Sequence, residues 1–222
     1  MFTLSNSPQP VALLGGTFDP IHLGHTQPAL QLADTFGWAK IHLQPCFAPP
    51  HRPAPAVSDQ HRFNMVKLAC SDDARLVADD FELRQQRPTR TVHTLAHLQQ
   101  LHPGASLCFI MGMDSLINFT SWLNWSEILQ LAHLFVLPRP GYHTSQIPAP
   151  LLPYVVAATD ATQTRFASGA GRIYLADTQP LDISATQLRA QLARSHSMPN
   201  RPCPAFIAPQ VYAYIQAHNL YQ

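Results

Sequence analysis

Apolar residues along the chain fall into short runs that alternate with longer stretches of helical periodicity. Short apolar runs bounded by turn residues are typical of buried strands, whereas helices repeat apolar positions three and four residues apart. The pattern predicts strands over residues 11–14, 41–44, 75–77, 107–111, 134–137 and 172–175, and helices over 22–36, 59–71, 91–101, 125–131, 185–194 and 208–218. Strands separated by helices imply crossover connections, and hence an α/β fold with a mostly parallel sheet and helices on both faces.

Local signals at the helix ends agree with this pattern. Ser58 is a candidate N-cap for the second helix, and Ser184 with Gln187 three residues later fits a capping box. Residues 138–168 are rich in Pro, Ala, Thr and Ser, and they predict loops. Because a strand and a helix follow them, we expect one domain over residues 1–222. Open sheets of this kind bind ligands beyond the carboxyl ends of their strands.

Composition narrows the class of protein. The 222 residues are 46% hydrophobic and carry a formal net charge of +1, which argues against a general nucleic-acid-binding or membrane-binding surface. The four cysteines do not have the spacing of a zinc site. Neither a secretory leader pattern nor a long apolar stretch is evident, so we expect a cytoplasmic protein. Nothing in the sequence predicts an oligomer.

The first chemical feature is the segment GGTFDPIHLGH at residues 15–25. Gly15 and Gly16 follow the first predicted strand directly, and a helix is predicted from His22. Glycines allow the backbone to approach a phosphate closely, and the N–H groups and dipole of a helix start favour negative charge. The segment matches neither the Walker phosphate loop, because it has no lysine, nor the dinucleotide fingerprint, because its glycines do not have the G-x-G-x-x-G spacing.

His22 and His25 stand where a phosphate-binding lysine is absent. Residues three apart share one helix face, so both imidazoles can donate hydrogen bonds to the same anion. The alternatives are a metal site and ordinary surface histidines. Two histidines alone are too few for zinc, and no Cys or Glu lies nearby in the sequence to complete a site. After a strand and a Gly-Gly turn, anion binding is the favoured interpretation.

A second segment, ISATQLR at residues 183–189, supports the first. Helical side chains lean toward the N-terminus, so Arg189 can reach an anion at the helix start beside the hydroxyls of Ser184 and Thr186. A plain capping box is the simpler interpretation. Together, the two segments predict two helix starts that meet one polyphosphate.

These two segments resemble the T-x-x-H-x-G-H and I-S-S-T-x-x-R motifs of the nucleotidyl transferases, with Ala185 where serine is common. Within that superfamily the chain is similar to the bacterial nicotinate-nucleotide adenylyltransferases from about residue 15 to residue 221. The match includes PPHR at 49–52, IMGMDSL at 110–116, Trp122, RPGY at 139–142 and a closing segment that ends in Leu220-Tyr221.

The resemblance implies a Rossmann-like fold and adenylyl transfer from ATP to nicotinate mononucleotide in NAD synthesis, with Mg²⁺ carried mainly by the ATP phosphates and no protein metal site. It implies catalytic roles for His22, His25 and Arg189. It assigns ATP binding to Gly15, Gly16, Thr17, Phe18, His22, His25, Gly112, Asp114, Ile183, Ser184, Thr186 and Arg189. It assigns acceptor binding to His51, Arg52, Thr91, Trp122 and Arg139. An indole face suits the cationic pyridinium of the acceptor, although core packing of Trp122 stays an alternative.

Two positions depart from the family pattern. Arg90 stands where the family often has tyrosine, and Met113 stands where it often has glutamine. Three other functions stay open at this point. They are a transferase of the same superfamily that acts on pantetheine phosphate or an alcohol phosphate, a nucleotide-sensing module without catalysis, and a histidine-rich metal-binding protein.

Overall fold

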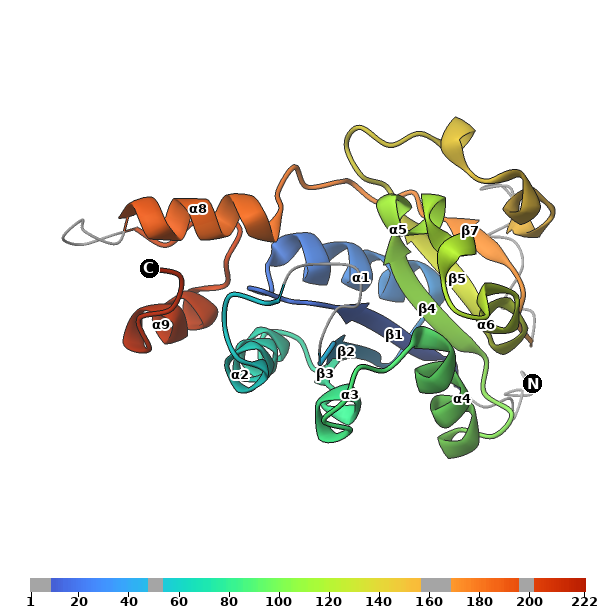
Figure 1. Ribbon diagram of the computed structural model, residues 1–222, viewed down its shortest axis with the longest axis horizontal. Helices are drawn as coiled ribbons and strands as arrows, with labels where there is room; N and C mark the ends of the chain where they lie inside the picture. Colours follow the sequence, from blue (N-terminus) through green and yellow to red (C-terminus); the bar gives the residue numbers. More distant parts are fainter. Residues whose placement is uncertain (1–8, 48–53, 157–168, 196–201) are drawn as a thin grey trace, which may run out of the picture.

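A seven-stranded parallel sheet forms the centre of the molecule (Figure 1). The computed structural model describes residues 9–47, 54–156, 169–195 and 202–222. The strands are β1 (Val11–Gly16), β2 (Ile41–Pro45), β3 (Leu76–Ala78), β4 (Leu107–Gly112), β5 (Ala132–Leu137), β6 (Val155–Val156) and β7 (Ile173–Leu175). Their order is β3-β2-β1-β4-β5-β7-β6. The strand order reverses between β1 and β4, so the crevice at their carboxyl ends is the expected ligand site.

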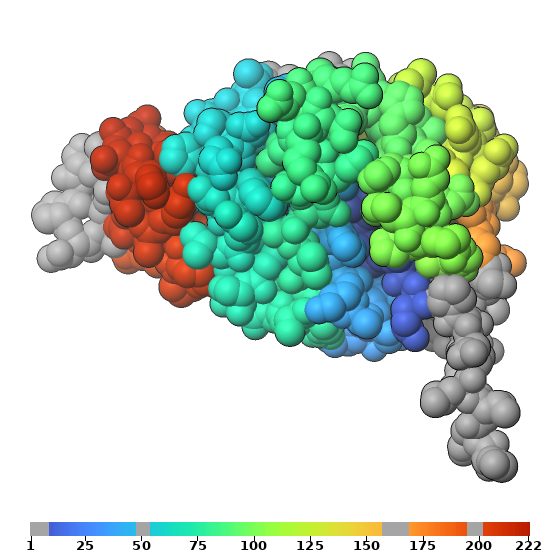
Figure 2. Space-filling model, turned by 90° about the horizontal axis from the view of Figure 1, so that it is seen from below, coloured from blue at the N-terminus to red at the C-terminus, as the bar shows by residue number. Residues whose placement is uncertain are grey.

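Helices connect the strands and cover both faces of the sheet. They are α1 (Leu23–Phe36), α2 (Asp59–Cys70), α3 (Phe81–Arg84), α4 (Thr91–Leu101), α5 (Met113–Ile117), α6 (Trp125–Leu131), α8 (Ala185–Ser195) and α9 (Pro209–Ala217), with the 3₁₀ helices η1 (Phe119–Ser121), η2 (Thr144–Gln146) and η3 (Ala149–Tyr154). The C-terminal helix α9 lies beside α2 (Figures 1 and 2). No helix in these described ranges is both long and apolar enough to cross a membrane.

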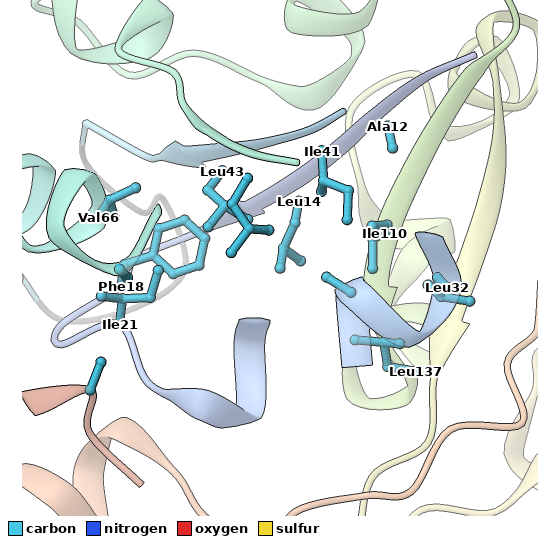
Figure 3. Packing of buried hydrophobic residues seen from close by; sticks show 14 of the residues in the cluster. Ala12, Leu14, Phe18, Ile21, Leu32, Ile41, Leu43, Val66, Ile110 and Leu137 are labelled. Carbon is cyan, nitrogen blue, oxygen red and sulfur yellow. The ribbon is translucent and has the colours of Figure 1, made fainter. Parts of the chain in front are cut away.

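Alternation along each strand divides the core into two layers. Ala12 and Leu14 of β1 point to one face, where they pack with residues of α1, α2, α8 and α9. Val11 and Leu13 point to the other face, where they pack with residues of α4, α5 and α6. Figure 3 shows the first layer at close range. The doubly wound, parallel α/β fold predicted from the sequence is therefore confirmed.

The structure adds elements that the sequence pattern did not predict. α3 and α5 are only four and five residues long, and α5 starts directly at the end of β4, without a polar break. The region predicted as loops, residues 138–168, contains η2, η3 and the edge strand β6 among its described residues. Both predicted caps are present. The Ser58 side chain accepts the His61 N–H at 3.3 Å, and the Ser184 N–H donates to Gln187 Oε1 at 2.7 Å.

Candidate active site

The loop after β1 is fixed by a buried aromatic ring. Phe18 is 2% exposed, has the left-handed φ of 49°, and points into the core beside Ile21 (Figure 3). A side chain on Gly16 would place Cβ 2.8 Å from the Phe18 ring, so only glycine fits there. A bulky residue in the left-handed region costs about 1–3 kcal/mol, which the burial of the ring offsets. The loop backbone is thus held in one shape at the carboxyl end of β1.

The two predicted phosphate-binding histidines lie against each other at the start of α1. His22 is the N-cap residue, and its ring centroid lies 3.8 Å from that of His25. The backbone N–H of His22 donates to Nδ1 of His25 at 3.3 Å. Because Nδ1 accepts this bond, a neutral His25 carries its proton on Nε2. In that tautomer Nε2 of His25 is a hydrogen-bond donor, as an anion requires.

His22 is the buried member of the pair. It is 4% exposed, and Nδ1 makes no hydrogen bond with any residue that the structure describes. Burial, followed by the positive charge of Arg139, lowers the pKa of His22 to about 4. The ring is therefore neutral at neutral pH and contributes hydrogen bonding without charge. Positive charge near this ring is carried by the guanidinium of Arg139.

Arg189 is the fifth residue of α8, and its side chain reaches the first motif. Its Nη1 donates to the main-chain oxygen of Asp19 at 2.7 Å, and its Nη2 donates to Thr186 Oγ1 at 3.2 Å. The two helix starts also meet directly. A Cβ on Gly24 would lie 2.9 Å from His22 Nδ1 and 3.1 Å from Cγ2 of Ile183. The structure therefore brings together the two segments that the sequence paired by pattern alone.

A third group of predicted residues stands at the carboxyl end of β4. Asp114 Oδ1 pairs with Arg139 Nε at 3.1 Å, and a side chain on Gly112 would collide with the Asp114 carboxylate. Arg139 was assigned to the acceptor side and Asp114 to the ATP side. The structure places them in one ion pair, close enough to His22 for the charge of Arg139 to affect its pKa.

Trp122, a predicted acceptor residue, lies in a cluster of aromatic rings. Its half-buried ring lies 5.4 Å from Phe119 and 6.2 Å from Phe109, measured between centroids. Phe109 in turn lies within 3.6 Å of the position that a Cβ on Gly15 would occupy. The Phe109 ring thus packs between Trp122 and the carboxyl end of β1, and part of the Trp122 surface stays exposed.

Three further residues belong to the predicted acceptor set: Thr91, His51 and Arg52. Thr91 is the first residue of α4, whose N-cap is Arg90. His51 and Arg52 lie outside the described residues, so the structure says nothing about their predicted roles.

Sequence reasoning gave no role to two buried charged residues that shape the site. Arg62 is 1% exposed, and its guanidinium donates to the main-chain oxygens of Thr17 at 2.8 Å and Phe47 at 3.1 Å. Asp19 is 4% exposed and bonds to Tyr221 and Ala56. Asp19 stands inside the recognised first motif, which was a usable signal. Arg62 lies in an ordinary helical pattern, where nothing distinguishes it from a surface arginine.

Comparisons with known proteins agree with the geometry. A family model described as cytidylyltransferase-like matches residues 13–191. A protein of Aeromonas hydrophila named "probable nicotinate-nucleotide adenylyltransferase" is 40% identical over 219 residues, which cover 96% of this chain and 97% of the relative. A protein of Aeromonas salmonicida with the same name is 42% identical over 220 residues, with coverage of 96% and 97%.

Solved structures show the same fold at lower identity. The nicotinic acid mononucleotide adenylyltransferase of Plasmodium falciparum, complexed with NaAD, superimposes with a TM-score of 0.72 at 19% identity and covers 96% of this chain and 97% of that one. The same enzyme complexed with APC gives a TM-score of 0.69 at 18% identity, with the same coverage of both chains.

Proposed function

Because this chain belongs to the nicotinate-nucleotide adenylyltransferases of the cytidylyltransferase-like family, we propose that its site transfers the AMP group of ATP to nicotinate mononucleotide. The products are nicotinate adenine dinucleotide and pyrophosphate, and the reaction is a step of NAD synthesis. The observation that carries the proposal is the meeting of the two helix starts, with Gly24 between His22 and Ile183. Two converging helix N-termini suit a polyphosphate better than any single-anion ligand.

The chemistry needs alignment and charge stabilisation rather than a strong base. The acceptor phosphate is already an anion at neutral pH, so its oxygen attacks the α-phosphorus without prior deprotonation. That bond forms as the bond from the α-phosphorus to the bridging oxygen breaks, and pyrophosphate leaves with the electron pair. His25 Nε2–H and the guanidinium of Arg189 stabilise the charge on the leaving group, together with the N–H groups of residues 15–18. The neutral ring of His22 packs against the ring of His25 and helps to hold it in place.

The remaining residues divide between the two substrates. On the ATP side, the backbones of Gly112 and Ile183 line the nucleotide, Ser184 and Thr186 offer hydroxyls at the helix start, and Asp114 accepts from ribose hydroxyls. The ion pair with Arg139 keeps the Asp114 carboxylate in place for this role.

On the acceptor side, Trp122 faces the pyridinium ring, whose positive charge an indole attracts. Thr91, His51, Arg52 and Arg139 bind the rest of the mononucleotide. Arg139 stands beside His22 and Asp114, which suits contact with the acceptor phosphate next to the ATP site.

Mg²⁺ enters this site with ATP. Within the described ranges, no three His, Cys, Asp or Glu side chains gather as a group that could hold a metal. Asp114, the carboxylate proposed here for the ribose hydroxyls, is paired with Arg139. A donor set built of N–H groups, imidazoles and guanidinium fits an ion held by phosphate oxygens and water, which is how Mg²⁺ is often bound. When bound, the ion neutralises charge on the phosphates.

A panel of acceptors tests the proposal. Purified protein with MgATP is given nicotinate mononucleotide, its amide analogue, pantetheine phosphate or an alcohol phosphate, and pyrophosphate release is followed. We expect the fastest turnover with nicotinate mononucleotide. Faster turnover of pantetheine phosphate would assign the chain to a different acceptor class. Tight ATP binding without turnover of any acceptor would favour a nucleotide sensor.

A further inference from the structure

A buried carboxylate stands behind the phosphate-binding loop, where four parts of the chain meet. Asp19 Oδ1 accepts the Tyr221 hydroxyl at 2.7 Å, and Oδ2 accepts the Ala56 N–H at 2.7 Å. Arg189 Nη1 donates to the main-chain oxygen of Asp19 at 2.7 Å and lies 3.7 Å from Oδ2. The carboxylate therefore attracts Arg189 electrostatically but accepts its hydrogen bonds from other groups.

The guanidinium of Arg189 is held at two points. Nη1 bonds to the Asp19 main chain, and Nη2 bonds to the Thr186 hydroxyl at 3.2 Å. These contacts use two of its five N–H donors and fix the plane of the group. A guanidinium fixed in this way presents its remaining donors in a defined direction.

The Tyr221 hydroxyl supplies one of the hydrogen bonds that the Asp19 carboxylate accepts. Without the Tyr221 hydroxyl, the Asp19 carboxylate lacks one buried donor, and Nη1 of Arg189 lies 3.7 Å from its second oxygen, Oδ2. Closing that gap by about 1 Å would form a charge-assisted hydrogen bond and draw the guanidinium back into the protein. Burial, followed by the charge of Asp19, raises the pKa of Tyr221, so the hydroxyl stays a donor at neutral pH.

The position of Tyr221 is set by the docking of α9. The Leu220 N–H donates to the Ile215 oxygen at 3.0 Å, which ties the last residues to the helix. The helix itself is tied to α2, because the Tyr214 hydroxyl lies 2.9 Å from both Asn64 Nδ2 and His61 Nδ1. The C-terminal segment thus reaches back to a residue 202 positions earlier in the chain.

We propose that Asp19 and Tyr221 are positioning residues that hold Arg189 ready for the triphosphate: Tyr221 occupies the Asp19 carboxylate, and the guanidinium of Arg189 stays directed at the ligand. The proposal rests on the function proposed above, in that Arg189 binds the phosphates of ATP. It adds the C-terminal segment to the parts of the chain that determine activity.

A double-mutant cycle tests this coupling. Tyr221→Phe is measured in the wild-type background and in the Arg189→Ala background, by kcat/KM for ATP and by ATP affinity from calorimetry. We expect Tyr221→Phe alone to lower both by about threefold to tenfold, the effect of one hydrogen bond. In the Arg189→Ala background we expect no further loss. Equal losses in both backgrounds, or no loss in the first, would overturn the proposal.

Two further variants separate positioning from folding. Tyr214→Phe removes another hydroxyl of the same C-terminal segment, whose hydrogen bonds described above go to α2 rather than to Asp19. This variant should lower thermal stability without changing kcat/KM. Asp19→Asn keeps the shape but removes the charge that draws Arg189 back, so adding Tyr221→Phe to it should cost little activity. If Tyr214→Phe and Tyr221→Phe lower activity alike, the role of Tyr221 is structural. The calorimetric cycle needs no acceptor, so it stands even if nicotinate mononucleotide is not turned over.

Discussion

Acid should destabilise this protein through His22. Burial and the charge of Arg139 lower the pKa of His22 to about 4 in the folded protein, whereas the pKa in an unfolded chain is about 6.5. Between these two values the unfolded state takes up a proton that the folded state does not, so the free energy of unfolding falls as the pH falls. The full gap corresponds to about 3 kcal/mol, of which about 2 kcal/mol is lost by about pH 5.

The variant His22→Gln isolates this contribution. The chain has 12 histidines, so the pH dependence of the wild type alone is a sum over many groups. Subtracting the unfolding free energy of the variant from that of the wild type cancels the contributions of the other titrating groups. Urea denaturation followed by circular dichroism, at about pH 8 and about pH 5, gives that difference. We expect the advantage of the wild type to shrink by about 2 kcal/mol between the two conditions.

Two outcomes would contradict the reasoning about His22. A difference that is the same at both pH values would mean that the ring is not held neutral by its surroundings. A titration of the His22 Cε1 proton near pH 6.5 by NMR would mean the same. Arg139→Gln serves as the matched variant for the second cause, because removing that charge should raise the pKa of His22 and reduce the pH dependence.

Three further predictions concern the site. His25→Ala should lower kcat by about 10² to 10³ with a modest change in KM, since it removes a donor to developing charge; an unchanged kcat in folded protein would remove His25 from catalysis. Trp122→Ala should raise KM for nicotinate mononucleotide and spare ATP affinity, and an equal loss for ATP would show that the substrates are wrongly divided. Gly24→Ala should cost about 1–3 kcal/mol of stability and lower ATP affinity, because its Cβ presses on His22 and Ile183; calorimetry that finds normal ATP affinity would argue against two helix starts sharing one ligand.

Much of the fold was predictable because it depends on local pattern. Buried strands such as β1 and β4 read as apolar runs, and the caps at Ser58 and Ser184 use side chains within three residues of the N–H groups involved. α5 was missed because it begins where β4 ends, so its apolar residues continue the same run. β6 was missed because two residues have no period, and its pairing with β7 exists only in the assembled sheet.

The site was predictable where a motif carries the chemistry. The meeting of residues 15–25 with residues 183–189 followed from two motifs and the rule for helix starts. The burial of the Phe18 ring and the role of Arg62 did not, because both depend on residues far away in sequence. The assignment of Arg139 to one substrate alone was a matter of resemblance, and its ion pair with Asp114 is visible only in three dimensions.

The central claim is that the two helix starts hold one triphosphate next to an acceptor stacked on Trp122. A crystal structure with a non-hydrolysable ATP analogue and nicotinate mononucleotide tests it most directly. We expect the β- and γ-phosphates within hydrogen-bond distance of His25 Nε2 and of the start of α8, and the pyridine ring against the indole of Trp122. A triphosphate bound away from either helix start, or a pyridine ring elsewhere in the crevice, would contradict the account.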